Sequence, residues 1–308
     1  MSARQQPERL GTRVHGQASL PTLIYLPGLH GDWTLVSSFR AAATGRVRFV
    51  EFTYPRSLTT SAADYAVAVE EALAAHGITQ GWLLGESFGS QVAWALLDRQ
   101  SKRTASSPCP VAADVSPRQF PECAPTHVGG YDRSDLPAPC SIQFQGLILV
   151  GGFVKHPWPW GARLLRWQAA HTPAWLLRVA LRGYEAYAGF RHRHAPETRA
   201  SIREFVERRT PLDGEAMRAR LELIATNDPR PIARRTTLPV HYLAGLVDPL
   251  VPWPFVRWWL RRQCPGYRGG TTLWLADHGA LVTQPQRAAA FVFGCMGIRR
   301  HPERSGVR

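Results

Sequence analysis

A serine flanked by glycines, in the pentapeptide Gly85-Glu86-Ser87-Phe88-Gly89, is the strongest chemical signal in the chain. The pattern G-x-S-x-G is typical of a nucleophilic serine on a sharp strand-to-helix turn, where a Cβ at either glycine would collide with the neighbouring strand or helix. A serine hydroxyl becomes a useful nucleophile only when a base takes its proton. Ser87 is therefore a candidate nucleophile, which needs a base and an acid from elsewhere in the chain. The alternative is an ordinary glycine-rich turn with an incidental serine.

An acid and a base follow in the chain order that this chemistry uses. Asp248 lies in LAGLVDPLVP, just after the predicted strand PVHYLAG, and His278 lies in LADHGALV, just after the predicted strand TTLWLAD. His278 would accept the proton of Ser87 and pass it to the leaving group, and Asp248 would hold the imidazole in one tautomer. Taken singly, the histidine could be a surface residue and the aspartate a turn residue before proline. Asp277 is a weaker candidate acid, because it is adjacent to the histidine in sequence.

A glycine-containing loop, LPGLHGDW at residues 26–33, could supply an oxyanion hole. Backbone N–H groups beside the serine would stabilise the charge that develops on a carbonyl oxygen, and losing one such donor typically costs about 10²–10³ in rate. The expected donors are the N–H of Leu29 or His30 and the N–H of Phe88. The side chain of His30 is expected to pack against Trp33 and is not predicted to act as a base.

Alternating strands and helices predict an α/β fold, with a mostly parallel sheet and helices on both faces. The three catalytic candidates all lie at predicted strand ends, and open α/β sheets place their sites at the carboxyl edge of the strands. Predicted strands occupy residues 22–28, 47–55, 81–87, 146–152, 239–245 and 271–277. Predicted helices occupy residues 61–76, with Thr60 or Ser61 as N-cap, 87–100, 254–264 and 281–295.

Two segments interrupt this alternation. Residues 101–143 are rich in Ser, Pro and Cys without a sustained period, which predicts a flexible insertion. Residues 153–235 have helical spacing with many Trp and Arg, and they lie between two predicted strands, which predicts a helical lid before the last strands. The predicted organisation begins with an N-terminal tail at 1–20, in which one short strand is the alternative to a wholly loose chain. An α/β core follows at 21–100, 144–152 and 236–296, with the insertion at 101–143, the lid at 153–235 and a C-terminal tail at 297–308.

Aromatic residues of the predicted lid are candidates for the roof of a substrate pocket. Trp158, Trp160 and Trp167, with Trp175 and Tyr184, could make this roof broad and apolar. For each of them singly, ordinary packing inside the lid is the alternative.

The formal net charge of +14 raises the question of an acidic partner. Only two of the 37 basic residues are lysines, Lys102 and Lys155, the arginines are scattered, and no nucleic-acid-binding motif is present. We therefore expect an ordinary basic surface and no nucleic-acid partner, with weak attraction to anionic substrates or membranes left open. The polar N-terminus and the lack of about 18 consecutive apolar residues predict a cytoplasmic protein without a transmembrane segment.

The five cysteines do not form a recognisable metal pattern. Cys109, Cys123 and Cys140 share one Pro-rich stretch with His127, but their spacings match no zinc site. We expect incidental thiols and no metal.

These motifs together resemble the α/β-hydrolase fold family, in particular its small lid-bearing members. The resemblance is carried by LPGLHGDW, GESFGS, GLILVGGF, LAGLVDPLVP and LADHGALV, and covers residues 22 to about 98 and 146 to about 294. It implies a Ser–Asp–His triad, an acyl-enzyme and no cofactor. The sequence departs from the family in an N-terminus too short for the usual first two strands, in the insertion at 101–143, and in Glu86, where His or Asn is also common.

The resulting hypothesis is a serine hydrolase that cleaves a carboxylic ester or similar acyl bond of a small molecule through an acyl-Ser87 intermediate. The same triad would serve a carbon–carbon bond hydrolase or an acyltransferase. From another class, the chain could be a non-catalytic binding protein that keeps the fold. The substrate, the bond type and the oligomeric state are left open, since fold does not decide function.

Overall fold

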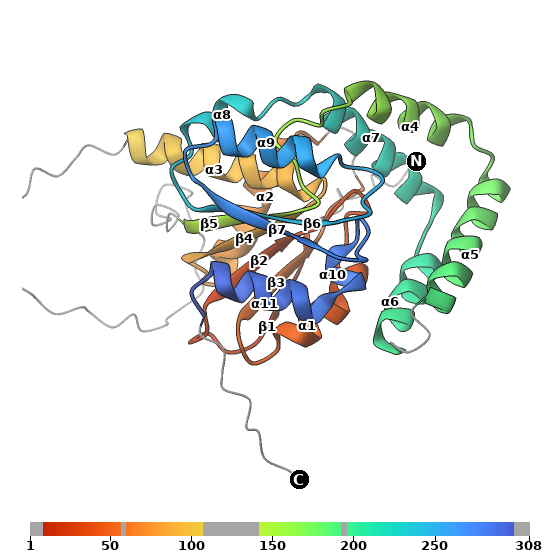
Figure 1. Cartoon of the computed structure of the whole chain (residues 1–308), viewed down its shortest axis with the longest axis horizontal. Coiled ribbons are helices and arrows are strands. Elements are labelled where there is room, and N and C mark those ends of the chain that lie inside the picture. Colours follow the sequence, from red (N-terminus) through yellow and green to blue (C-terminus); the bar gives the residue numbers. More distant parts are fainter. Residues whose placement is uncertain (1–8, 57–59, 107–141, 192–195, 299–308) are drawn as a thin grey trace, which may run out of the picture.

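The computed structural model describes residues 9–56, 60–106, 142–191 and 196–298 (Figure 1). Most of the predicted insertion, together with Cys109, Cys123, Cys140 and His127, lies outside these ranges. The core is a seven-stranded sheet in the order β1-β3-β2-β4-β5-β6-β7. Only β1 runs antiparallel to its neighbour, β3. The strands are β1 (Gly11–His15), β2 (Thr22–Leu26), β3 (Arg48–Thr53), β4 (Gln80–Glu86), β5 (Gln143–Val150), β6 (Val240–Gly245) and β7 (Tyr267–Leu273).

Helices cover both faces of the sheet, which confirms the predicted α/β class. In Figure 1, α2, α3, α8 and α9 lie on one face and α1, α10 and α11 on the other. The helices are α1 (Ser37–Ala43, preceded by the 3-10 helix η1, Thr34–Val36), α2 (Ala62–Ala75), α3 (Gly89–Ser106), α4 (Pro159–His171), α5 (Ala174–Arg191), α6 (Pro196–Glu207), α7 (Pro211–Thr226), α8 (Arg230–Arg235), α9 (Trp253–Gln263), α10 (Ala280–Thr283) and α11 (Pro285–Cys295).

Strand β2 shows why the sheet needs helices on both sides. Successive side chains of a strand point to opposite faces. Ile24 and Leu26 enter the core beneath α2 and α3, whereas Leu23 and Tyr25 enter the core beneath α1 and α11. All four side chains are fully buried, so each face requires an apolar cover.

The start of α2 identifies which residue caps it. Ser61 accepts a hydrogen bond from the backbone N–H of Asp64, and Asp64 in return accepts one from the N–H of Ser61. This reciprocal capping box satisfies two backbone donors that the helix leaves free. Ser61, and not Thr60, is the N-cap.

The predicted N-terminal tail contains a strand. Gly11–His15 form β1, which pairs with β3, so this is the one short strand that the tail at 1–20 was expected to allow. Glu51 of β3 helps to hold this edge, because its buried carboxylate accepts hydrogen bonds from Arg40 of α1 at 2.6 and 2.7 Å and pairs with His15 at 3.1 Å. The sequence GTRVH has too few apolar residues to show alternation, so its strand depends on this pairing. One antiparallel strand therefore precedes the parallel ones.

In the described part of the chain, α4 to α8 lie between β5 and β6, and we call the first four of them, α4 to α7, the helical segment. Helix α4 packs against α7, α5 packs against α6, and α6 contacts η1 and α1. Figure 1 shows α4 to α6 projecting past the edge of the sheet. Helices were predicted here, and their action as a lid stays a prediction. Within the described ranges, no helix is both long and apolar enough to span a bilayer.

Candidate active site

Ser87 occupies the turn between β4 and α3 in a strained backbone conformation. Its φ is +48°, a region that residues with a side chain rarely adopt and that is found where the surrounding structure imposes it. Its N–H donates to the carbonyl of Val150 in β5 at 3.0 Å, which extends the sheet ladder into the turn. A Cβ on Gly89 would lie 2.1 Å from the carbonyl oxygen of Leu26, so only glycine fits there. The turn has the strand–turn–helix context that the motif predicts.

His278 and Asp248 meet at the carboxyl ends of β6 and β7. The Nδ1 of His278 donates to Oδ2 of Asp248 at 2.8 Å. The second oxygen, Oδ1, accepts from the backbone N–H groups of Leu250 and Val251 at 2.8 and 3.0 Å, and the carboxylate is fully buried. Asp277, the weaker candidate acid, accepts instead from the N–H of Gly279 at 3.0 Å. The structure therefore pairs the histidine with Asp248.

The charge of Asp248 makes the imidazole of His278 more basic. Burial alone lowers the pKa of His278, but the hydrogen bond to Asp248 and the negative charges of Asp248, Glu86 and Asp277 outweigh it. The net result is a pKa raised above the ordinary value of 6.5. The bond at Nδ1 leaves Nε2 as the nitrogen that can exchange a proton with a neighbour.

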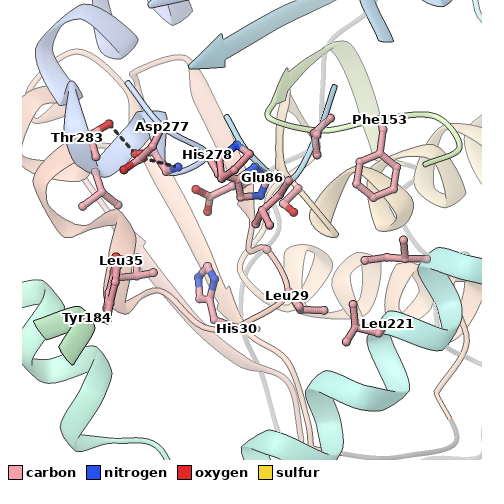
Figure 2. A pocket seen from close by; sticks show the side chains of 18 of the residues that line it. Leu29, His30, Leu35, Glu86, Phe153, Tyr184, Leu221, Asp277, His278 and Thr283 are labelled. Carbon is pink, nitrogen blue, oxygen red and sulfur yellow. Dashed lines mark hydrogen bonds between the residues drawn. The ribbon is translucent and has the colours of Figure 1, made fainter. Parts of the chain in front are cut away.

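Ser87 and His278 line one cavity of about 370 Å³ (Figure 2). The wall is mostly apolar and draws on the sheet edge and on the helical segment. From that segment come Tyr184 and Tyr187 of α5, Ile202 of α6, and Leu221 and Ile224 of α7. From the core and its loops come Gly28, Leu29, His30, Leu35, Glu86, Phe153, His156, Pro249, Leu250, Val251, Asp277, Gly279, Val282 and Thr283.

The tryptophans predicted to roof the pocket lie elsewhere. Trp158, Trp160 and Trp167 are 43%, 64% and 59% exposed and do not line this cavity. Trp167 packs against His171 of its own helix, with ring centroids 4.7 Å apart. Helical spacing identified aromatic positions on α4 but not which face of α4 meets the protein. Tyr184, named beside them, does reach the cavity.

The loop after β2 brings backbone donors close to Ser87. The N–H of Gly31 donates to the carbonyl of Gly28 at 3.0 Å, which closes a tight turn. Gly28 lies against the serine, since a Cβ on it would be 3.4 Å from the Cβ of Ser87. Among the residues that the structure describes, none accepts a hydrogen bond from the N–H of Leu29, His30 or Phe88. These donors are therefore available to a ligand.

Arg220 of α7 holds this loop from behind. Its guanidinium donates to the carbonyl of Leu29 at 3.0 Å and to that of Pro55 at 3.3 Å, and the residue is 2% exposed. Gly31, with φ of +78°, leaves room for it, because a Cβ there would lie 2.2 Å from Nη1 of the arginine. In a trans peptide the C=O and N–H point in opposite directions. Holding the Leu29 carbonyl therefore also orients the N–H of His30.

Arg209, between α6 and α7, binds the same loop at a second point. It donates to the carboxylate of Asp32 and, at 3.4 Å, to the carbonyl of His30. Burial raises the pKa of Asp32, but the charges of His30 and Arg209 and the bond from Thr34 outweigh this and lower it to about 2. Sequence reasoning missed both arginines, because they lie far along the chain among many other arginines.

The side chain of His30 packs against Phe205 of α6, with ring centroids 6.0 Å apart in an edge-on arrangement, and not against Trp33 as expected. Burial is the main cause that lowers its pKa. A neutral imidazole at neutral pH follows.

Glu86 also faces the cavity, directly before the serine. Its carboxylate accepts a hydrogen bond from the hydroxyl of Tyr25 and is almost fully buried. Within the described part of the chain, no group of three or more His, Cys, Asp and Glu side chains could hold a metal ion.

Similarity to solved structures agrees with this architecture. The chain resembles a hydrolase from Pseudomonas aeruginosa, with a TM-score of 0.66, 15% identity and 94% of both chains covered. It also resembles an esterase from Thermogutta terrifontis, with a TM-score of 0.64, 16% identity, and 94% of this chain and 93% of that one covered. An enol-lactonase from Burkholderia xenovorans gives a TM-score of 0.64 at 15% identity, over 94% of this chain and 96% of that one. No family model and no curated protein matches the sequence.

At these identities the likeness establishes the fold. The chain has the α/β-hydrolase fold, as its motifs predicted.

Proposed function

We propose that the chain is a serine hydrolase that cleaves a carboxylic ester or similar acyl bond through an acyl-Ser87 intermediate. The observation that carries this proposal is the 2.8 Å bond from His278 to Asp248, on a wall of the same cavity that Ser87 lines. A strained serine and backbone N–H groups without partners are both costly features, and a binding protein would need neither. That the similar structures include an esterase and an enol-lactonase is consistent with an acyl–oxygen bond as target.

The first half of the reaction forms the acyl-enzyme. His278 takes the proton of Ser87 at Nε2 while the serine oxygen bonds to the carbonyl carbon. The carbonyl electron pair moves onto oxygen, where the N–H of Phe88 and that of Leu29 or His30 stabilise it. When this pair returns, the bond to the leaving oxygen breaks and His278 gives that oxygen its proton. Asp248 stabilises the imidazolium throughout.

Water completes the cycle by the same steps. His278 takes a proton from water as the water oxygen attacks the acyl carbon, and returns that proton to Ser87 as the acid leaves. The helical segment would act as a lid whose Tyr187, Ile202 and Leu221 favour an apolar acyl group. An acyltransferase would differ only in the acceptor, and an added alcohol competing with water would reveal it.

The test is hydrolysis of p-nitrophenyl esters from acetate to dodecanoate by the wild type and by Ser87→Ala. We expect activity in the wild type and its loss in the variant, with an unchanged fold by circular dichroism. Ser101→Ala, which removes an exposed hydroxyl of α3, is the matched control and should keep full activity. A fluorophosphonate should label the peptide that contains Ser87. A folded wild type that neither hydrolyses any ester nor takes the label would contradict the proposal.

A further inference from the structure

Glu86 places a carboxylate beside the nucleophile with one of its oxygens unused. The residue is 6% exposed and lines the cavity. Its Oε2 accepts from the hydroxyl of Tyr25. Burial is the main cause that raises the pKa of Tyr25 well above its usual value, so the phenol keeps its proton and remains the donor. Among the described residues, none donates to Oε1 of Glu86.

The described residues that line the cavity include no arginine or lysine that could compensate this carboxylate, and Asp277 adds a second carboxylate. Arg209 and Arg220 lie behind the loop after β2, where they donate to Asp32 and to backbone carbonyls. A buried carboxylate is stable only when it is well paired, and a single phenol is a weak partner. The charge is therefore available to a ligand.

The negative charge of Glu86 reaches the groups around the reacting centre. It contributes to the raised pKa of His278 and to that of Tyr184, which stands on α5. Figure 2 shows Glu86 beside His278, with Tyr184 across the cavity. A substrate carbonyl on Ser87 would share the cavity with this carboxylate, because both residues line it.

We propose that Glu86 makes this cavity select acyl groups by charge, favouring esters with an ammonium or other hydrogen-bond donor on the carbon next to the scissile carbonyl and rejecting those with a carboxylate there. This inference rests on the proposed function and names its substrate class. A donor at that carbon fills Oε1 with a charge-assisted hydrogen bond, which is about twice as strong as a neutral one. A substrate carboxylate meets like charge in a site of low dielectric.

Three p-nitrophenyl esters that share one branched carbon test the proposal. The alanine ester carries an ammonium there, the isobutyrate ester a methyl group, and the methylmalonate half-ester a carboxylate. Measured as kcat/KM with the spontaneous rate subtracted, the wild type should prefer alanine over isobutyrate and isobutyrate over methylmalonate. In Glu86→Gln, which keeps the shape and an acceptor for Tyr25, the ratio of alanine to methylmalonate should fall roughly tenfold or more.

Two further variants separate charge at this site from general effects. Glu71→Gln makes the same charge change at an exposed position of α2 and should leave the ratio at its wild-type value. Tyr25→Phe keeps the carboxylate but frees its second oxygen, so the preference for alanine should hold or grow, and this variant decides the matter if Glu86→Gln does not fold.

Equal ratios in the wild type and Glu86→Gln, with isobutyrate turned over, overturn the inference and leave the proposed function intact. If the wild type hydrolyses straight-chain p-nitrophenyl esters but none of these three, the inference fails and the proposed function stands. If it hydrolyses no ester and takes no fluorophosphonate label, the proposed function fails and this inference fails with it.

Discussion

The positions of Ser87, His278 and Asp248 are each set by different local interactions. Ser87 has a strained backbone conformation, with φ of +48°, and its N–H donates a hydrogen bond to the carbonyl of Val150 in β5. The histidine is oriented by the carboxylate, and the carboxylate by two backbone N–H groups of its own loop. Because Asp248 is buried and its Oδ1 accepts from two backbone N–H groups, its position does not depend on the histidine. It can therefore act as a fixed support for the ring.

Asp248→Asn should change both the rate and its pH dependence. We expect kcat to fall by about 10⁴, because the amide favours the wrong imidazole tautomer. A free His278 must be neutral to act as a base, so the raised pKa places the acid limb of kcat/KM above pH 6.5 in the wild type. Removing the charge of Asp248 removes the largest causes that raise this pKa, so the residual activity should have its acid limb at lower pH.

The measurement is kcat/KM across about pH 5 to pH 9. Asp277→Asn, which alters the neighbouring carboxylate but not the 2.8 Å bond, should lose much less activity than Asp248→Asn. A near-normal rate in Asp248→Asn would show that another group supports the base.

At the level of elements, the loop after β2 is held by residues from a distant part of the chain. Arg220 and Arg209 reach it from the helical segment and bind the carbonyls of Leu29 and His30. Helix α6 also packs against η1, which follows the loop directly. The segment that walls the cavity thus also holds the backbone that we propose as the oxyanion donor.

Arg220→Met should lower kcat more than it raises KM. Methionine keeps much of the apolar contact but leaves the carbonyls of Leu29 and Pro55 without their donor, so the loop can shift. Losing an oxyanion donor typically costs about 10²–10³ in rate. Arg220→Lys, which can restore one of the bonds, should recover part of the loss. Steady-state kinetics on a short-chain ester measure this.

The matched control is Arg199→Met, at an exposed position of α6, which should behave as wild type. If Arg220→Met lost stability but kept kcat in the remaining folded protein, the arginine would be structural and would not position the donor.

Most strands that carry the site could be predicted because they are short apolar runs with a turn after them, as at TLIYLPG and GLILVGG. The exception is β7, Tyr267–Leu273, which begins before the predicted range 271–277 because YRGGTTL is not an apolar run. The positions of Ser87, Asp248 and His278 at predicted strand ends then placed them on one sheet edge. Residues whose role depends on tertiary contact could not be found this way. The sequence alone cannot distinguish Arg220 from the other arginines, because its role depends on the packing of α7 against the loop. It also cannot show that Trp167 lies outside the pocket, because that depends on the orientation of α4.

At the scale of the whole molecule, stability at the edge of the sheet relies on one buried carboxylate. Glu51 joins β3 to α1 through Arg40 and to β1 through His15. The strand β1 has few apolar side chains of its own, as GTRVH shows, and for this reason its sequence predicted a tail with at most one short strand. The molecule is strongly basic overall, with a formal charge of +14. Among the described residues, however, the mostly apolar cavity wall carries carboxylates and histidines and no arginine or lysine.

Glu51→Gln should destabilise the fold without changing catalysis per folded molecule. The variant leaves the guanidinium of Arg40 without its counter-charge, and hydrogen bonds to charged groups contribute about 1.5–3 kcal/mol. We expect a loss of that order in the free energy of unfolding, measured by urea denaturation. Glu71→Gln, the same change on the exposed surface of α2, should leave the midpoint where it is. An unchanged midpoint in Glu51→Gln would show that the pairing at this edge contributes little.

The two arginines behind the oxyanion loop limit how this protein can be re-engineered. A designer who wished to alter its substrate range would naturally transplant residues 159–226 from another hydrolase. Such a chimera would lose Arg209 and Arg220 along with the cavity wall, so its loop would lack two anchors however well the new helices packed. A change of this segment would therefore alter both the substrate range and the turnover. An active chimera would need hydrogen-bond donors to the carbonyls of Leu29 and His30 as well as a new cavity wall.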